Sequence, residues 1–378
     1  MEAMSARERL LYQQVEAGLR AHSVDLSLLD AYRERHVAVF WRGYRVIREQ
    51  SMRIFGEQPA FLFASLAPED AGVGFSMQRA IYAALGGRAF ATTVAPLGAV
   101  YNAIIGLIDK LTDNFPEWLP SLQSALTPAS LAALLTLDHP IPLPRPPRPA
   151  GASLEGSSRI DLLLTLIEDY VDQAATLARR AGRSDVWRDF QTLYLDLMRH
   201  QFASAALAND DCPASADALQ TAIGRTAPTL WAYFINAWLA PDTRAPTDRA
   251  RVRSAVDRWG EAVVLSEDLC DLVADTEEGR WNTVTLLATL RGYVPLTQRE
   301  LREQPDVVLD QLLAAEVPKW AASDMCERFS SAFAQFEALA PGCFASLANL
   351  GQEVLCYPLF APQLSQSKRV MSETAVQV

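Results

Sequence analysis

Apolar residues recur at three- and four-residue intervals in almost every long segment of this 378-residue chain. This is the period of an amphipathic α-helix. Ala and Leu dominate and runs of β-branched residues are few, which favours helix over strand. The sequence therefore predicts an all-α protein. Helices are expected over residues 5–20, 27–55, 76–94, 97–110, 128–137, 158–182, 184–208, 214–240, 248–275, 281–291, 297–303, 306–316, 318–339 and 342–357.

One segment, residues 139–157, is expected to be a loop. It carries six prolines, which exclude a helix or a central strand. It is interpreted as a loop inside a single domain of residues 1–365, with a domain linker as the alternative. Residues 366–378 are polar and are expected to form a flexible tail. No repeat of solenoid period is present, although the composition would also suit a helical-repeat scaffold.

The charge balance limits the partners. A net charge of −11 argues against non-specific nucleic-acid binding, which needs a basic face. An acidic protein that binds a polyanionic substrate needs bridging cations, so the charge is compatible with metal dependence. The five cysteines show no CxxC spacing and the four histidines lie far apart, so no zinc cluster is expected. With no signal peptide or apolar membrane span, we expect a cytoplasmic soluble protein.

Three carboxylates share one stripe of the helix expected over residues 248–275. Glu267, Asp271 and Asp275 stand four residues apart, so the stripe is about 12 Å long. Like charges at this spacing destabilise a helix by about 0.2–0.5 kcal/mol per pair, and a divalent cation removes that repulsion. Glu267, Asp271, Asp275 and the neighbouring Asp268 are therefore candidate magnesium ligands. A solvated acidic helix face is the alternative.

A second acidic pair, Asp109 and Asp113, lies at the end of the very apolar helix expected over residues 97–110. Carboxylates there oppose the helix dipole, so another interaction should favour them. The pair is a second candidate metal site, with a solvated C-terminal turn as the alternative. A lone DxxxD is weak, but two acidic stripes in one helical protein strengthen the interpretation.

A cation stands at a break in the helix expected over residues 214–240. Gly224 and Pro228 bracket Arg225 and Thr226. A break frees backbone amides and presents both side chains as donors, which is what a phosphate requires. A simple kink between two helices is the alternative.

In this order and spacing, the motifs resemble the superfamily of trans-polyprenyl diphosphate synthases and class I terpene synthases. In that superfamily a glycine precedes an aspartate-rich DDxxD motif, and a further Asp and a Gly-Lys pair follow it. Here Gly260 stands seven positions (267 − 260) before the segment Glu267-Asp268-Leu269-Cys270-Asp271, and Asp275 and Gly279-Arg280 come after it. The triplet Glu267, Asp271, Asp275 also looks like the metal triad of terpene cyclases.

The upstream motifs extend the resemblance to about residues 76–291. Arg225-Thr226 lies 42 positions (267 − 225) before Glu267, near where the superfamily has a Lys-Thr pair at a helix break. The segment from Asp109 to Asp113 resembles the first DDxxD motif with Lys110 in place of its second Asp.

Two departures concern the elongating members, which hold their second diphosphate with a GGKR-type segment and an Arg-Arg pair. This chain has only Gly86-Gly87-Arg88 and, after the first acidic pair, Asn114-Phe115-Pro116. The departures favour cyclisation over chain elongation.

The resemblance implies a single large helical bundle of the isoprenoid synthase type with a central active-site cavity. It implies three Mg²⁺ ions between Asp109/Asp113 and Glu267/Asp271/Asp275, and a prenyl diphosphate as substrate. Aromatic faces stabilise carbocations by about 2 kcal/mol or more when desolvated, although such side chains also serve as ordinary core. The implied diphosphate-binding residues are Arg225, Thr226, Arg280 and Arg88, and the candidate cavity aromatics are Tyr101, Trp231, Tyr233, Phe234 and Trp238.

The expected function is therefore a class I terpene synthase that ionises an allylic prenyl diphosphate and cyclises or rearranges the carbocation. No nucleic acid and no membrane span are expected, and a homodimer is left open. An elongating prenyltransferase is the first alternative. A catalytically silent helical subunit is the second, and Lys110 favours it, because its ammonium group could pair with Asp113 and weaken metal binding.

Overall fold

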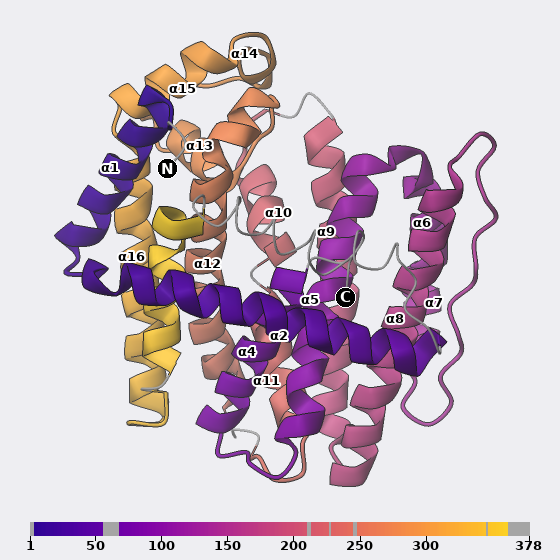
Figure 1. Cartoon of the computed structure of the whole chain (residues 1–378). Coiled ribbons are helices and arrows are strands. Elements are labelled where there is room, and N and C mark those ends of the chain that lie inside the picture. Colours follow the sequence, from indigo (N-terminus) through magenta and orange to yellow (C-terminus); the bar gives the residue numbers. More distant parts are fainter. Residues whose placement is uncertain are drawn as a thin grey trace. The chain divides into compact units, whose positions relative to one another are not determined.

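The computed structural model describes residues 4–55, 68–209, 213–226, 228–244, 248–344 and 347–361. These residues form helices joined by turns and loops, and they contain no strand (Figure 1). The all-α prediction is confirmed.

The chain divides into two compact units, each gathered from separate stretches of sequence. The first comprises Met1–Arg35, Ala203–Leu230 and Asp248–Arg369, and the second His36–Phe202, Trp231–Thr247 and Val370–Val378. Neither unit is one continuous stretch that could be separated by a single cut. The single domain of residues 1–365 stays a prediction, and the tail expected over residues 366–378 lies outside the described residues.

The first unit is built around one long helix, α12 (Arg249–Glu277), which packs along α16 (Val317–Leu339). The ring of Trp259 lies 5.4 Å from Phe333 and forms the centre of this contact. Asp248 caps the start of α12 by accepting a hydrogen bond from the Arg251 amide. The unit's other elements are α1 (Ala6–Ala21), η1 (Leu26–Leu28), the start of α2 (Leu29–Phe55), α10 (Ala216–Thr226), α13 (Thr283–Leu290), α14 (Gln298–Glu303), α15 (Pro305–Ala314) and a helix over residues 347–361.

The second unit is built around α5 (Ala91–Asn114), a very apolar helix that packs against α4 (Pro68–Ala84) and α8 (Leu154–Ala181). Ser153 caps the start of α8, and Gly182, in the left-handed region at φ 63°, ends it. The unit's other elements are the rest of α2, η2 (Pro116–Trp118), α6 (Leu119–Ala125), α7 (Pro128–Leu134), most of α9 (Ser184–Asn209) and most of α11 (Pro228–Trp238).

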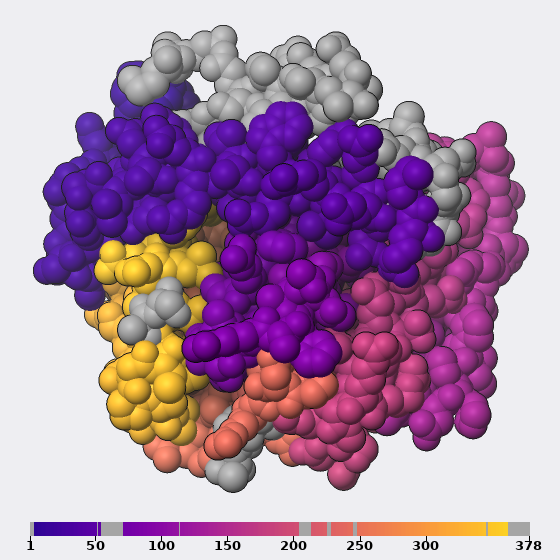
Figure 2. Space-filling view, turned by 60° about the horizontal axis from the view of Figure 1, so that its bottom comes forward, coloured from indigo at the N-terminus to yellow at the C-terminus, as the bar shows by residue number. Residues whose placement is uncertain are grey.

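Two glycines let α4 and α5 cross with their backbones in contact. A Cβ atom at Gly74 would lie 2.3 Å from the Gly98 carbonyl oxygen, and one at Gly98 would lie 2.5 Å from the Gly74 oxygen. On the other side of α4, a Cβ atom at Gly72 would lie 2.0 Å from the Val39 oxygen of α2. Figure 2 shows the violet residues of α4 beside the indigo band of α2. Only glycine fits such close approaches.

This crossing makes Gly98→Ala destabilising. We expect the free energy of unfolding in urea to fall by about 1–3 kcal/mol, because the added methyl group must push two backbones apart. In a helix without such a contact, the same change would stabilise by about 1 kcal/mol through helix propensity. The sign of the change in unfolding free energy therefore distinguishes the two cases. An increase in stability on Gly98→Ala would contradict the close crossing of α4 and α5.

The proline-rich segment is a loop, as predicted, but it ends before residue 157, because α8 begins at Leu154. Between residues 139 and 150 only Leu143, Pro146 and Pro149 are not exposed, a three-residue period typical of a polyproline II helix. The Leu143 amide donates to Glu168 of α8 (2.8 Å), and Arg145 pairs with the same carboxylate (2.8 Å). The segment is thus a loop bound to the surface of the second unit.

Helix boundaries differ from the prediction at several places, and the helix expected over residues 76–94 ends at Ala84, before the turn with Gly86 at φ 81°. The break expected at residues 95–96 is wrong, because α5 runs through Pro96, which lies in its second turn and removes a single backbone hydrogen bond. The break expected between Gly224 and Pro228 is confirmed, because α10 ends at Thr226 and α11 begins at Pro228. The last expected helix, 342–357, lies at residues 347–361.

By length and composition, residues Ala91–Thr112 of α5 could cross a membrane. More than half of that window is buried inside the protein, and the core helix of a soluble protein passes the same test, so this is weak evidence. It does not contradict the expected absence of a membrane span.

Candidate functional site

The acidic stripe lies on α12 as its spacing predicts. Glu267 and Asp271 are exposed and Asp275 is half-buried, whereas Leu269 and Leu272 between them are buried. The helix therefore presents the three carboxylates on one face and packs its leucines on another. Each of the three residues takes part in at least one interaction with another part of the chain.

Asp268 points away from this stripe. It is one residue, or about 100° of helical turn, from Glu267. Its side chain is only 3% exposed, and its Oδ2 accepts a hydrogen bond of 2.6 Å from the Thr283 amide at the start of α13. This geometry gives the carboxylate a structural role, and its assignment as a metal ligand stays a prediction.

Asn282 joins the stripe to the following helix. Its Nδ2 donates to Oδ2 of Asp275 and to the backbone oxygen of Asp268, both at 3.1 Å. Its Oδ1 accepts from the Thr285 amide at 3.0 Å, which caps α13. Asn282 is not among the site residues predicted from the sequence. An Asn directly before the apolar helix of residues 283–290 is the capping signal that could have drawn attention to it.

The turn between α12 and α13 presents Arg280. Gly279 lies in the left-handed region at φ 68°, and its carbonyl oxygen accepts a hydrogen bond of 2.7 Å from the buried Gln298. Arg280 is half-buried and pairs with Glu278 at 2.8 Å. A fixed turn thus holds a guanidinium group five residues after Asp275.

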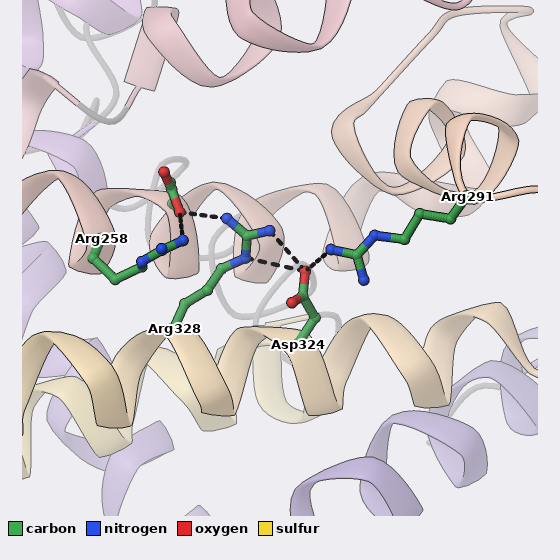
Figure 3. A network of polar contacts seen from close by, with 5 residues as sticks. Arg258, Arg291, Asp324 and Arg328 are labelled. Carbon is green, nitrogen blue, oxygen red and sulfur yellow. Dashed lines mark hydrogen bonds and ion pairs between the residues drawn. The ribbon is translucent and has the colours of Figure 1, made fainter. Parts of the chain in front are cut away.

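An ion-pair network binds α12 to α16 and α13. Figure 3 shows Arg328 of α16 at its centre. Arg328 pairs with Glu261 of α12 and, at 2.9 Å, with Asp324, which also pairs with Arg291 at 3.5 Å. Arg258 pairs with Glu261 at 2.8 Å. These ion pairs connect α12, the helix that carries the stripe, to α16 and to the end of α13.

The donor chemistry of the stripe fits Mg²⁺, which favours carboxylate oxygens and completes its octahedron with water and phosphate. Across the part of the chain that the structure describes, no three His, Cys, Asp or Glu side chains converge closely enough to enclose a metal ion.

The second acidic motif lies on α5 in the second unit. Asp109 is half-buried, and its backbone oxygen accepts a hydrogen bond of 2.9 Å from the Thr112 hydroxyl. The side chains of Asp113, Arg225 and Thr226 lie outside the described part of the structure. The two acidic motifs belong to different units, so their opposition across a shared space stays a prediction.

The backbone of the loop that carries Arg88 binds the side-chain carboxylate of Asp242. Asp242 Oδ2 accepts hydrogen bonds from the Arg88 and Ala89 amides, both at 2.8 Å, and its two oxygens accept from the Tyr82 hydroxyl at 2.7 Å. Burial raises the pKa of Tyr82 to about 12, with help from Asp242. Burial would also raise the pKa of Asp242, but these hydrogen bonds outweigh it and lower that pKa below its usual value.

The candidate cavity aromatics are all buried side chains of the second unit. The ring of Tyr101 lies 6.1 Å from Tyr233, whose hydroxyl donates to Asn102, and Trp231 stacks on Phe234 at 6.5 Å. Burial raises the pKa of the neighbouring Tyr170 well above its usual value. Their role as a cavity lining stays a prediction.

The fold is that of known isoprenoid enzymes. No protein-family model and no curated protein matches the sequence. Among solved structures, the chain is similar to the geranylgeranyl pyrophosphate synthetase of the archaeon Geoglobus acetivorans, with 13% identity, a TM-score of 0.51, and 84% of this chain and 99% of that one covered.

A second similar structure is the isoprene synthase of grey poplar leaves (Populus x canescens). The identity is 12% and the TM-score 0.50, and the match covers 92% of this chain but spans only 57% of that one. At these identities the likeness shows the fold, so this chain has the all-α isoprenoid synthase fold.

Proposed function

We propose that this chain, which has the isoprenoid synthase fold, is a magnesium-dependent class I terpene synthase that ionises one allylic prenyl diphosphate and cyclises or rearranges the product cation. The observation that carries the proposal is the stripe of Glu267, Asp271 and Asp275 along one face of α12. Two structural neighbours are named for making geranylgeranyl pyrophosphate and isoprene, which supports an isoprenoid substrate of the same chemical class.

In this proposal the stripe and Asp109 with Asp113 hold the metal, and Arg225, Thr226 and Arg280 donate hydrogen bonds to the diphosphate. Bound magnesium supplies neutralisation of the charge that develops on the leaving group. The buried aromatic side chains exclude water, which would otherwise quench the cation.

Cyclisation is favoured over chain elongation by the loop of Arg88. Elongation requires a second diphosphate, and the resemblance assigns its binding partly to this loop. The Arg88 and Ala89 amides already donate to Asp242, so an incoming phosphate would have to displace a carboxylate to use them. The missing Arg-Arg pair after Asp113 acts in the same direction.

The test is to incubate the purified chain with geranyl, farnesyl or geranylgeranyl diphosphate, with Mg²⁺ or with EDTA, and to measure pyrophosphate and extractable hydrocarbon. We expect pyrophosphate release together with a hydrocarbon product, and the loss of both in EDTA. The cytoplasmic location belongs to the same proposal.

Two outcomes would contradict the proposal. Release that depends on added isopentenyl diphosphate would support an elongating prenyltransferase. No turnover of any substrate would support a silent subunit, the alternative that Lys110 in the first acidic motif favours.

A further inference from the structure

We infer that Asn282 is a positioning residue for the metal site, because it fixes the carboxylate of Asp275 and ties it to the turn that carries Arg280. The inference rests on the proposed function, in which Asp275 binds metal and Arg280 binds the diphosphate. The resemblance to prenyl diphosphate enzymes does not point to Asn282, and only the structure connects this residue with the stripe.

The amide group of Asn282 is held on three sides. The residue is 2% exposed, so its side chain is enclosed by protein. Its Nδ2 donates to the Asp268 backbone oxygen and to Oδ2 of Asp275, both at 3.1 Å, while its Oδ1 accepts from Thr285. Because the nitrogen and the oxygen of this planar amide are both hydrogen-bonded, the side chain is held in one orientation. In that orientation its Nδ2 donates to the carboxylate of Asp275.

The buried carboxylate of Asp268 also holds this turn in place. Asp268 Oδ2 accepts from the Thr283 amide at 2.6 Å, so residues 282 and 283 are both bonded to residue 268. Charge-assisted bonds of this kind are short and strong. The turn of residues 278–283 therefore cannot shift along α12 without breaking these two hydrogen bonds. They hold Arg280 at a fixed position relative to Asp275.

A carboxylate that binds metal is typically oriented by a hydrogen bond to its second oxygen, and losing that partner weakens metal affinity about 10- to 100-fold. Asn282 supplies such a bond to one oxygen of Asp275, while the carboxylate's other oxygen takes no part in it. Asn282 thus acts on the metal through Asp275.

The substitution Asn282→Ser separates positioning from helix capping. Serine is as good an N-cap as asparagine, so the bond to the Thr285 amide can be kept, but it has no amide donor for Asp275. Thr127→Ala is the matched control, because it removes the cap of α7, whose Thr127 hydroxyl accepts from the Ser130 amide at 3.1 Å. Thr127 lies in the other unit, far from the stripe in sequence.

The experiment titrates Mn²⁺ into the full chain in the presence of inorganic pyrophosphate and follows free Mn²⁺ by electron paramagnetic resonance, with thermal unfolding in parallel. Mn²⁺ shares the oxygen-ligand preference of Mg²⁺. We expect Asn282→Ser to raise the Mn²⁺ dissociation constant about 10- to 100-fold. Thr127→Ala should lower the thermal midpoint at least as much and leave the Mn²⁺ affinity unchanged.

Wild-type affinity in Asn282→Ser would overturn the inference. Asn282→Thr, which also keeps a capping hydroxyl, replaces it if the serine variant does not fold. Asp271→Ala separates a failure of the positioning role from a failure of the proposed function. If Asp271→Ala loses Mn²⁺ binding while Asn282→Ser keeps it, only the positioning role of Asn282 is contradicted. If the wild-type chain binds no Mn²⁺ with pyrophosphate, the proposed function and the positioning role fail together.

Discussion

Asp271→Ala should reduce metal-dependent release of pyrophosphate at least about a thousandfold. A carboxylate that holds metal on the leaving diphosphate contributes several kcal/mol to transition-state stabilisation, and each 1.36 kcal/mol corresponds to about a factor of ten in rate. Asp271 is the middle residue of the stripe, so its loss leaves the outer two carboxylates eight residues apart. The rate is measured as pyrophosphate release at saturating Mg²⁺.

The same substitution should leave the fold intact. Asp271 is exposed, so its removal opens no cavity in the core. It also removes two like-charge i, i+4 pairs, each of which destabilises the helix by about 0.2–0.5 kcal/mol. The thermal midpoint is therefore expected to stay level or to rise slightly.

Glu277→Ala is the control for Asp271→Ala. Glu277 is an exposed acid at the end of the same helix, two residues after Asp275 and hence about 200° around the helix from it. We expect it to retain wild-type turnover. Wild-type turnover in Asp271→Ala would remove that residue from the metal site and leave the solvated acidic face as the better interpretation of the stripe.

The parts of the structure that follow from local spacing were predictable. Helices and the shared face of Glu267, Asp271 and Asp275 depend only on a period of 3.6 residues, and the structure contains both. Spacing also separates Asp268 from the stripe by about 100°, yet the chemical likeness of adjacent acids led to its inclusion among the candidate ligands. In the structure its Oδ2 instead accepts a hydrogen bond from the Thr283 amide at the start of α13.

The contacts that orient the candidate site were not predictable from spacing. Asn282 reaches back across 14 residues to Asp268 and across 7 to Asp275, which depends on the path of the turn at Gly279. The contact between Asp242 and the Arg88 amide spans 154 residues. In both cases a polar side chain forms hydrogen bonds with backbone or charged groups of another segment. The periodicity of the sequence does not predict such pairings.

Asp242→Ala should destabilise the chain by about 2–4 kcal/mol, because it removes the acceptor of several charge-assisted hydrogen bonds at once. The Arg88 and Ala89 amides lose their partner, and the hydroxyl of Tyr82, a residue only 1% exposed, loses its acceptor. The measurement is the free energy of unfolding in urea at pH 7.

Two variants calibrate this loss. Asp242→Asn keeps one acceptor oxygen, so its loss should lie between those of the wild type and the alanine variant. Asp196→Ala removes a partner of an exposed pair on α9, in which Arg199 lies 3.1 Å from the Asp196 carboxylate. Because exposed pairs contribute about 0–1 kcal/mol, this control should change stability little. Equal effects of Asp196→Ala and Asp242→Ala would contradict a special role for Asp242.

The stabilisation by Asp242 should disappear in acid. Hydrogen bonds from Tyr82 and the two amides hold the pKa of Asp242 below its usual value, against the opposing effect of burial. A carboxyl whose pKa is lowered by folding stabilises the folded state fully above its unfolded pKa of about 3.9, and progressively less as the pH falls through the folded pKa. The difference in stability between wild type and Asp242→Ala should therefore be constant from about pH 5 to 8 and shrink below about pH 4. A difference that grows in acid would mean that the carboxyl is protonated in the folded protein, and the loop of Arg88 would then need another explanation.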